Sequence, residues 1–350
     1  MRATRARLWL AALCMVVLAA CAGDGGGGKP TVTSLECPQG WIAPESCTWG
    51  SIPGIGSGWL VSEQGCTGDM PCAKDEVSRY GSVWFKDDAT GKCQRLMTDL
   101  SHPNGVAADI DGNVWVATKD GVVVRAAASG VQVAQPIESA GLLNDVTAVP
   151  GYAGVVVTDS VTDKVWAVGL DGEALVHGLY GVVPGSPNGI APSYGDGFAV
   201  VGLGDLKLPG APGAPGGITD VSPDDGHGAC APWHAGAQKG LAAPAGRKLD
   251  GIVPATLSGV RGYLVSAIYN IDVGTAKGVD AGLEATLWFI PADGSAAKQV
   301  FDGAKHGLLS AADIGRSPDG RVCVPDLNGT TTPTDGATGA KIIIVDGLVK

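Results

Sequence analysis

The sequence predicts an all-β protein with the fold of a six-bladed β-propeller. Glycine contributes 55 and proline 22 of the 350 residues, whereas charged residues make up only 17% of the chain. No stretch shows the i, i+3, i+4 spacing of apolar residues that an amphipathic helix requires. Instead, short apolar segments bounded by turn residues recur at intervals of roughly 40 to 65 residues, which is the scale of propeller blades.

The first twenty residues are predicted to be a signal peptide rather than part of the fold. Three arginines precede an apolar run over residues 8–20, which is too short to remain as a membrane-spanning helix. The run ends in LAAC, with the cysteine at Cys21, and this resembles the lipobox of bacterial lipoproteins. The resemblance implies cleavage before Cys21 and lipidation of its thiol. The alternative is an ordinary secretory signal in which small residues happen to precede a cysteine.

Residues 21–36 are expected to form the lipidated end and a flexible tether, because AGDGGGG is small and polar. Ala22 follows the cysteine at a position where a signal for inner-membrane retention would prefer aspartate. We therefore expect a protein of the cell envelope, anchored by its lipid to the outer membrane and facing the periplasm or the cell surface.

The charge of the mature chain argues against two classes of partner. The full-length net charge of −11 becomes −14 once three arginines and no acidic residue leave with the signal peptide. An acidic body is a poor partner for nucleic acid or for anionic lipid. We therefore expect no nucleic-acid binding, and membrane contact through the N-terminal lipid only. The oligomeric state stays open.

The propeller is predicted over residues 37–350. Six segments begin with a polar or small residue, enter a short apolar strand, turn at glycine or Asp-Gly, and return in a β-branched strand. These segments are residues 44–62, 103–118, 143–160, 187–204, 249–269 and 310–327, with the marker positions Glu45, Asn104, Asn144, Asn188, Asp250 and Asp313. Further strands such as GVVVRAA, KVWAVGLDG, TLWFIPADG and KIIIVDG are expected to complete four-stranded blades. Six such units fit the mature chain, and ring closure leaves few exposed strand edges.

An insertion is expected at about residues 205–247, where proline, glycine and alanine dominate. We expect it to add a loop, and at most one edge strand, to blade four. His227 and His234 lie in it near Cys230, which allows either a metal cluster or a solvent-exposed loop with a disulfide partner.

Seven cysteines follow the lipidated one, at positions 37, 47, 66, 72, 93, 230 and 323. In an exported protein they allow three disulfides and one free thiol. Five fall between residues 37 and 93, so stapling is expected near the N-terminus, and Cys66 with Cys72 is the easiest pair to imagine. A zinc site is the rival interpretation, although no CxxC motif supports it.

The inner strands of a propeller aim the side chains at their starts toward one axial point. Here those starts carry Glu45, Asn144, Asn188 and Asp250, all of which offer oxygen donors. Two carboxylates and two amides suit a hard divalent cation such as Ca²⁺. The alternative is local, because Asn-Gly, Asp-Gly and Asn-Asp are common turn formers. Four oxygen donors at one phase of four blades favour a shared site.

The chain from residue 44 onward resembles the regucalcin (senescence marker protein) and gluconolactonase family. Members are six-bladed propellers that hold a divalent metal in the channel and hydrolyse sugar lactones. PESCTW resembles the first-blade segment whose glutamate binds metal, which implies Glu45 as a ligand. SPNGIAP and KLDGIVP resemble the fourth- and fifth-blade ligand segments, which implies Asn188 and Asp250, and the aspartate is also the family's proposed general base. LLNDVTAV resembles the third-blade segment, which implies a substrate-binding role for Asn144.

The chain departs from that family in one region. Val146 follows Asn-Asp where the family usually continues with glycine, and QPIESAGLL, just before it, lacks the substrate-orienting arginines of the sugar-lactone enzymes. The nature of the substrate is therefore open.

The sequence supports two functions. The first is a metal-dependent hydrolase of the sugar-lactone lactonase type at the cell envelope, acting on a small lactone or sugar acid. Ca²⁺ is the favoured metal, with Zn²⁺, Mg²⁺ and Mn²⁺ as alternatives. The second is a non-catalytic, lipid-anchored propeller that binds a partner and keeps a structural metal in its channel. A serine hydrolase or a P-loop enzyme is not indicated, because neither GxSxG nor GK[ST] occurs.

Overall fold

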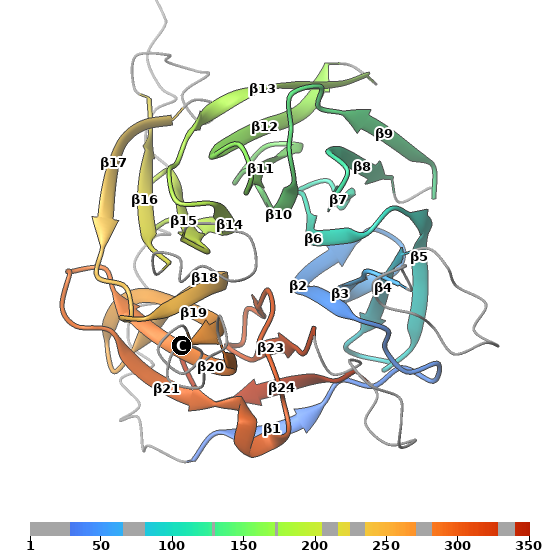
Figure 1. Ribbon diagram of the computed structural model, residues 1–350. Helices are drawn as coiled ribbons and strands as arrows, with labels where there is room; N and C mark the ends of the chain where they lie inside the picture. Colours follow the sequence, from blue (N-terminus) through green and yellow to red (C-terminus); the bar gives the residue numbers. More distant parts are fainter. Residues whose placement is uncertain are drawn as a thin grey trace, which may run out of the picture.

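A computed structural model shows six four-stranded antiparallel sheets arranged around a central axis (Figure 1). It describes residues 29–65, 81–127, 130–171, 174–204, 216–224, 235–270, 282–327 and 340–350. The six-bladed propeller predicted from the sequence is therefore confirmed. Cys21, Cys66, Cys72, Cys230, His227 and His234 lie outside the described residues, so the predictions about them stay predictions.

Blades one to three follow the chain from the innermost strand outward. Blade one is β2 (Pro44–Ile52), β3 (Gly56–Glu63), β4 (Gly81–Asp87) and β5 (Cys93–Leu100). Blade two is β6 (Pro103–Ala108), β7 (Val114–Thr118), β8 (Val122–Ala126) and β9 (Gln132–Pro136). Blade three is β10 (Leu143–Ala148), β11 (Gly154–Asp159), β12 (Lys164–Asp171) and β13 (Ala174–Val182).

Blades four and five repeat this order, and blade six closes the ring. Blade four is β14 (Pro187–Pro192), β15 (Phe198–Gly202), β16 (Ile218–Pro223) and β17 (Ala235–Leu241). Blade five is β18 (Arg247–Leu257), β19 (Val260–Asn270), β20 (Gly282–Pro291) and β21 (Lys298–Asp302), followed by the 3₁₀ turn η2 (Gly303–His306). Blade six is β22 (Gly315–Arg316), β23 (Val322–Pro325), β24 (Ile342–Asp346) and, outermost, β1 (Thr31–Ser34).

Two boundaries expected from the sequence are corrected. Residues 31–34 were assigned to the tether, but β1 pairs with β24 in register from Thr31 opposite Asp346 to Ser34 opposite Ile343. The sequence predicts a loop and at most one edge strand over residues 205–247, yet this range contains two strands, β16 and β17, which are half of blade four. In both places short, weakly apolar strands gain their stability from the strand beside them, so their own composition did not reveal them.

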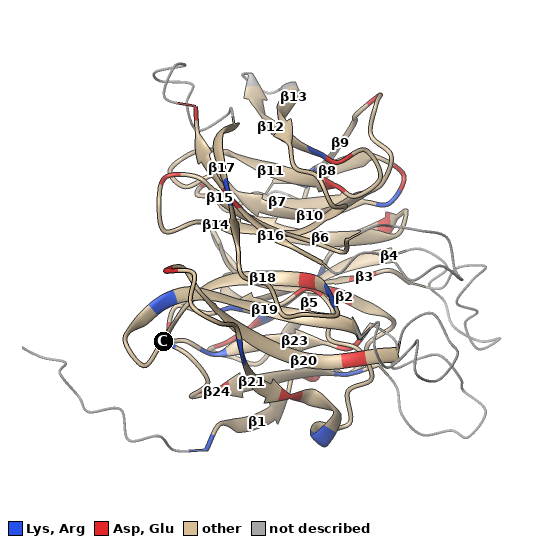
Figure 2. Cartoon of the chain, turned by 60° about the vertical axis from the view of Figure 1, so that its left-hand side comes forward, with Lys and Arg blue, Asp and Glu red and all other residues tan. Residues whose placement is uncertain are grey.

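The core of the molecule lies between the blades. The described residues form six buried apolar clusters, one at each junction between neighbouring blades. Charged residues lie chiefly at strand ends and connections, and the blades are largely free of them (Figure 2). The sheets therefore pack face to face as apolar surfaces around the ring. No helix in the described ranges has the length and apolarity needed to cross a bilayer.

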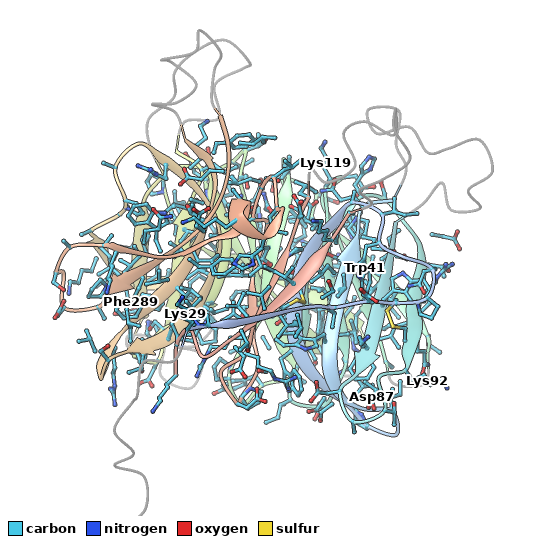
Figure 3. All side chains as sticks on the ribbon, turned by 90° about the horizontal axis from the view of Figure 1, so that it is seen from below. Lys29, Trp41, Asp87, Lys92, Lys119 and Phe289 are labelled. Carbon is cyan, nitrogen blue, oxygen red and sulfur yellow. A yellow bond between two sulfur atoms is a disulfide. The ribbon has the colours of Figure 1, made fainter. Side chains whose placement is uncertain are left out.

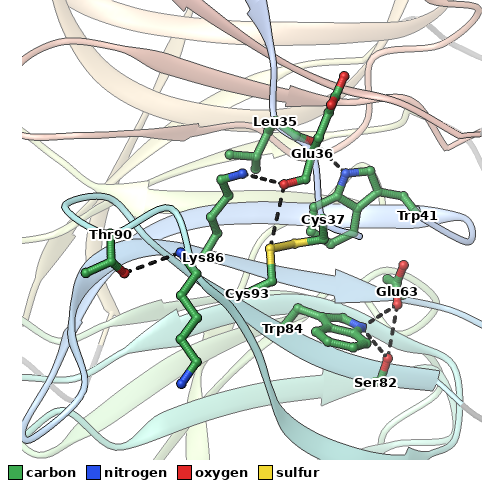
Figure 4. Close-up of a disulfide and its surroundings, with 11 residues drawn as sticks. Leu35, Glu36, Cys37, Trp41, Glu63, Ser82, Trp84, Lys86, Thr90 and Cys93 are labelled. Atoms are coloured by element: carbon green, nitrogen blue, oxygen red, sulfur yellow. Dashed lines mark hydrogen bonds between the residues drawn. A yellow bond between two sulfur atoms is a disulfide. The ribbon is translucent and has the colours of Figure 1, made fainter. Parts of the chain in front are cut away.

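Covalent bonds reinforce the place where the ring closes. Cys47 on β2 is joined to Cys323 on β23, so a disulfide crosses from blade one to blade six. Cys37 is joined to Cys93 on β5, which fixes the segment after β1 to the outer edge of blade one (Figure 4). The carbonyl of Glu36 accepts a hydrogen bond from Nζ of Lys86 beside this second disulfide. Both bonds involve blade one; the bond from Cys37 to Cys93 lies in the N-terminal region where the cysteines cluster, whereas the bond from Cys47 to Cys323 reaches the C-terminal part of the chain.

Candidate metal centre in the channel

The innermost strands are irregular at the marker positions. In blades one to five the antiparallel register shifts where Glu45, Asn104, Asn144, Asn188 and Asp250 occur. A shift of this kind is a β-bulge, which takes a residue out of the regular ladder and re-aims its side chain. In blade six, Asp313 precedes β22 and bridges in parallel to Ser46 of blade one. Each blade therefore presents one marker residue near the axis.

Three marker side chains share a feature that the others lack. Glu45, Asn188 and Asp250 are buried, with 6%, 3% and 2% of their surfaces exposed. Each has one buried oxygen without a protein hydrogen-bond partner: Oε2 of Glu45, Oδ1 of Asn188 and Oδ1 of Asp250. The other such atoms among the described residues are guanidinium nitrogens and tyrosine hydroxyls. Within the described part of the chain, all the unpartnered buried carboxyl and amide oxygens therefore belong to the three predicted ligands.

The charges of this group are unfavourable without a cation. Burial, followed by the negative charge of Asp313, raises the pKa of Glu45 to about 8, although Lys119 acts in the opposite direction. Burial and then the charges of Glu45 and Asp313 raise the pKa of Asp250 well above its ordinary value, and the amide of Asn188 lowers it. Glu45 and Asp250 therefore lie close enough to repel one another, and a positive charge between them would relieve that repulsion.

The donor set fits a hard divalent cation. Among the described residues, no three His, Cys, Asp or Glu side chains are placed to hold a metal ion by themselves. A site here therefore needs the amide oxygen of Asn188 beside the two carboxylates. Oxygen-only donors suit Ca²⁺, Mg²⁺ or Mn²⁺ better than Zn²⁺, which prefers nitrogen and sulfur. Buried oxygens without a partner are costly in a folded protein, and ligation would satisfy all three.

The two polar residues in the third-blade segment differ in their contacts. Nδ2 of Asn144 donates to Oγ of Ser160 at 3.2 Å, and the residue is only partly buried. Asp145 is buried, and its carboxylate accepts hydrogen bonds from the backbone N–H of Val146 at 2.7 Å and of Ile190 in blade four at 2.8 Å. The described contacts of Asn144 are therefore local to blade three, whereas Asp145 links blades three and four.

Blade six contributes a further acid to this group. Asp313 accepts a hydrogen bond from Oγ of Ser46 at 2.6 Å, and its backbone N–H donates to the carbonyl of Glu45 at 3.0 Å. Burial raises the pKa of Asp313 to about 6, while the hydrogen bond from Ser46 lowers it. Asp313 therefore fixes the backbone of Glu45 and adds negative charge to the channel.

Sequence reasoning missed two residues near the site. Tyr269 is the penultimate residue of β19, and burial and the charges of Asp250 and Glu45 raise its pKa. Lys119 follows β7 and donates its backbone N–H to the carbonyl of His102 at 3.1 Å. Lys119 lies at one face of the ring and Asp87 and Lys92 at the other (Figure 3). Neither residue occupies the marker position of a recurring segment, so the repeat pattern did not predict that they lie near the site.

No family model matches this sequence, and no curated protein matches it. Solved structures do share its fold. The gluconolactonase of Xanthomonas campestris superposes with a TM-score of 0.56 at 14% identity, over 93% of this chain and 92% of that one. A second structure, provisionally described as a gluconolactonase, gives 0.57 at 14% identity, over 92% and 93%. The virginiamycin B lyase of Staphylococcus aureus gives 0.52 at 10% identity, over 85% and 82%.

These similarities concern the fold. The first two neighbours are gluconolactonase-type six-bladed propellers, as the sequence resemblance implied. The third is named as a lyase. Identities of 10–14% do not carry activity from one chain to another, because one propeller architecture supports different chemistries.

Proposed function

We propose that this protein is a metal-dependent hydrolase of the lactonase type. The observation that carries the proposal is a group of three buried oxygens without protein partners, Oε2 of Glu45, Oδ1 of Asn188 and Oδ1 of Asp250; the Asp250 side chain interacts with those of both other residues. These atoms come from blades one, four and five. Burying three such oxygens without partners would destabilise the fold unless a common ligand bound them.

The residues of the channel divide the work of ring opening among them. Glu45 and Asn188 would hold the cation, together with Asp250. A bound divalent cation would supply a Lewis acid that polarises the ester carbonyl and offsets the developing negative charge. Asp250 would take the proton of the attacking water, which is the role that the resemblance to the gluconolactonase family implies for it, and would return that proton to the ring oxygen as the ester bond breaks. Asn144, less buried than the three ligands, binds the hydroxyl groups or ring oxygen of the substrate.

The proposed place of action is the cell envelope. A lipid on Cys21 would hold the propeller at the outer membrane, facing the periplasm or the cell surface. Membrane fractionation of cells that produce the full chain tests this directly. The wild-type chain should sediment with membranes, and Cys21→Ser should release it; equal sedimentation of both would contradict the lipid anchor.

The alternative is a propeller that binds its ligand without hydrolysing it. It is favoured by the third-blade segment, which lacks the arginines that orient substrate in the sugar-lactone enzymes. In that case the cation would stabilise the channel, and Asn144 would contact a ligand that leaves unchanged. Only turnover distinguishes the two functions, since both use the same cation site.

The deciding experiment is hydrolysis of a panel of aldonolactones and simple γ- and δ-lactones by the purified chain. The protein is stripped with chelator and then supplied separately with Ca²⁺, Mg²⁺, Mn²⁺ or Zn²⁺. We expect acid release only after a cation is restored. A folded protein that binds cation and opens none of the lactones would support the binding function instead. A folded protein that binds no cation would contradict both.

A further inference from the structure

Three buried hydroxyls occupy the same position in alternate blades. Ser62 on β3, Thr158 on β11 and Ser266 on β19 are fully buried, each on the second strand opposite a bulge. Each accepts a hydrogen bond from a backbone N–H of its own bulge. The donors are Ser46 at 3.1 Å, Asp145 at 2.9 Å and Gly251 at 2.7 Å.

Each hydroxyl also donates across the junction to the next blade. Ser62 donates to the carbonyl of Asn104, Thr158 to that of Asn188, and Ser266 to that of Ala312 at 2.8 Å. The second strands of blades two and four have Ala117 and Val201 opposite their bulges, so they carry no hydroxyl there. Three hydroxyls thus link the blades in pairs: one with two, three with four, and five with six.

These hydrogen bonds act on the backbone of the cation ligands. A bulge interrupts the strand ladder, so the N–H and carbonyl groups beside it need other partners. Ser62 accepts from the backbone N–H of the residue after Glu45, and Ser266 accepts from that of the residue after Asp250. Thr158 donates to the backbone carbonyl of Asn188 itself. Every predicted ligand therefore has its backbone fixed by one of these hydroxyls, within one residue.

We propose that Ser62, Thr158 and Ser266 are positioning residues that set the geometry of the cation site. This inference rests on the cation site of the proposed function and needs no turnover. Each hydroxyl has two roles: it accepts a hydrogen bond from a backbone N–H of the bulge, and it fixes the direction in which a ligand side chain points toward the axis. A buried hydroxyl that served packing alone would have no reason to face a bulge in all three of these blades.

Thr158 offers the sharpest test, because two substitutions separate its hydroxyl from its shape. Thr158→Val keeps the branched shape and removes the hydroxyl, so the N–H of Asp145 and the carbonyl of Asn188 lose a partner. Thr158→Ser keeps the hydroxyl and removes a methyl group. We expect Thr158→Val to weaken cation binding by about 10- to 100-fold, as changes around metal ligands commonly do. Thr158→Ser should stay within about threefold of wild type on the same scale.

Calorimetric titration of the chelator-treated full chain with Ca²⁺ measures the affinity, and the spectrum of bound Mn²⁺ by electron paramagnetic resonance reports ligand geometry. Thr286→Val is the matched control, because Thr286 is buried on β20 but its hydroxyl bonds the side chains of Glu284 and Trp288 on its own strand instead of the backbone of a neighbouring blade. We expect an altered Mn²⁺ spectrum for Thr158→Val and wild-type spectra for Thr158→Ser and Thr286→Val. Urea unfolding of each metal-free variant separates weakened ligation from a general loss of stability.

The outcomes distinguish this inference from the proposed function. Wild-type affinity and spectrum in Thr158→Val would overturn the positioning role alone and leave the cation site intact. Equal weakening in Thr158→Ser and Thr158→Val would also overturn it, since the hydroxyl would then be irrelevant. If the wild-type chain binds neither Ca²⁺ nor Mn²⁺, the cation site fails, and the positioning role fails with it. Loss of lactone hydrolysis plays no part in any of these readouts.

Discussion

Two identical tripeptides of this chain differ in the hydrogen bonds that their asparagine side chains make. Pro-Asn-Gly occurs at residues 103–105 and 187–189, and in both places it forms the bulged start of an innermost strand. Asn104 and Asn188 are equally buried, each with 3% of its surface exposed. Nδ2 of Asn104 donates to the carbonyl of Leu143 at 2.8 Å, and its Oδ1 accepts from Nε2 of Gln64 at 3.0 Å. Oδ1 of Asn188 has no protein partner.

This difference shows what separates a structural polar residue from a candidate ligand. Residue type, local sequence, burial and backbone geometry are shared by the two asparagines, so none of them decides the role. The neighbours decide it: blade one supplies Gln64 to Asn104, whereas Asn188 lies beside the carboxylate of Asp250. The feature that marks a candidate ligand here is a buried oxygen without a hydrogen-bond partner in the protein.

The largest effect on activity is expected at Asp250. It lies beside Asn188 and is the most buried of the three predicted cation ligands. Asp250→Asn keeps the shape but removes the charge and the base, so lactone hydrolysis should fall by roughly 10²- to 10⁴-fold. Initial rates at saturating Ca²⁺ measure the loss, and circular dichroism checks the fold. Asp99→Asn, at an exposed position of β5, is the control and should keep wild-type rates. Full activity in Asp250→Asn would remove this residue from the mechanism.

The second prediction exchanges the two asparagines. Asn188→Ala should weaken Ca²⁺ binding by more than about 100-fold, because it removes a ligand. Asn104→Ala should leave Ca²⁺ affinity near that of wild type. It should lower the free energy of unfolding by about 2 kcal/mol, since the carbonyl of Leu143 and the amide of Gln64 lose their partner. Titration calorimetry and urea denaturation test the two halves. The comparison breaks down if the two variants behave alike.

The innermost positions could be predicted from the sequence because the repeat sets their phase. Glu45, Asn188 and Asp250 all stand one residue after the start of a β-type segment, so a single pattern placed them at one axial point. The partners of Asn104 could not be predicted, because Gln64 lies outside the recurring positions. The outermost strands were missed for a related reason: TVTS and AGAQKGL carry little apolar periodicity and are held by the neighbouring strand.

The pairing of the cysteines likewise could not be predicted from the sequence. The count and spacing indicated stapling near the N-terminus, but the bond from Cys47 to Cys323 joins residues 276 positions apart. That pairing follows from closure of the ring, which places β2 beside blade six. It becomes visible only when the fold is known.

A third prediction concerns pH and the carboxylates around Asn188. Glu45 has a pKa of about 8 in the folded chain against 4.5 as its ordinary value, and the pKa of Asp250 is raised as well. The folded state therefore holds more protons than the unfolded state between about pH 4.5 and 8. The free energy of unfolding of metal-free protein should fall as pH rises through this window, by on the order of 1 kcal/mol per pH unit for each such group.

Saturating Ca²⁺ should flatten that dependence, because the cation replaces the protons as the partner of both carboxylates. Urea denaturation from pH 5 to 8, with chelator or with Ca²⁺, measures it. Glu45→Gln should reduce the slope in chelator, since its side chain does not titrate. Metal-free wild-type protein that is as stable at pH 8 as at pH 5 would contradict the repulsion between these acids.

The smallest effect is expected from making Asn104 resemble Asn188. Gln64→Met removes the donor to Oδ1 of Asn104 while keeping a side chain of similar length, and it leaves that buried oxygen without its partner. The free energy of unfolding should fall by about 1 kcal/mol, the usual contribution of one hydrogen bond. Gln132→Met, on exposed β9, is the control and should change stability by less than about 0.5 kcal/mol. Ca²⁺ affinity should stay unchanged, because an unsatisfied oxygen binds a cation only where carboxylates share the site. A measurable change in Ca²⁺ affinity in Gln64→Met would place Asn104 within the cation site, and the two tripeptides would then differ in degree rather than in kind.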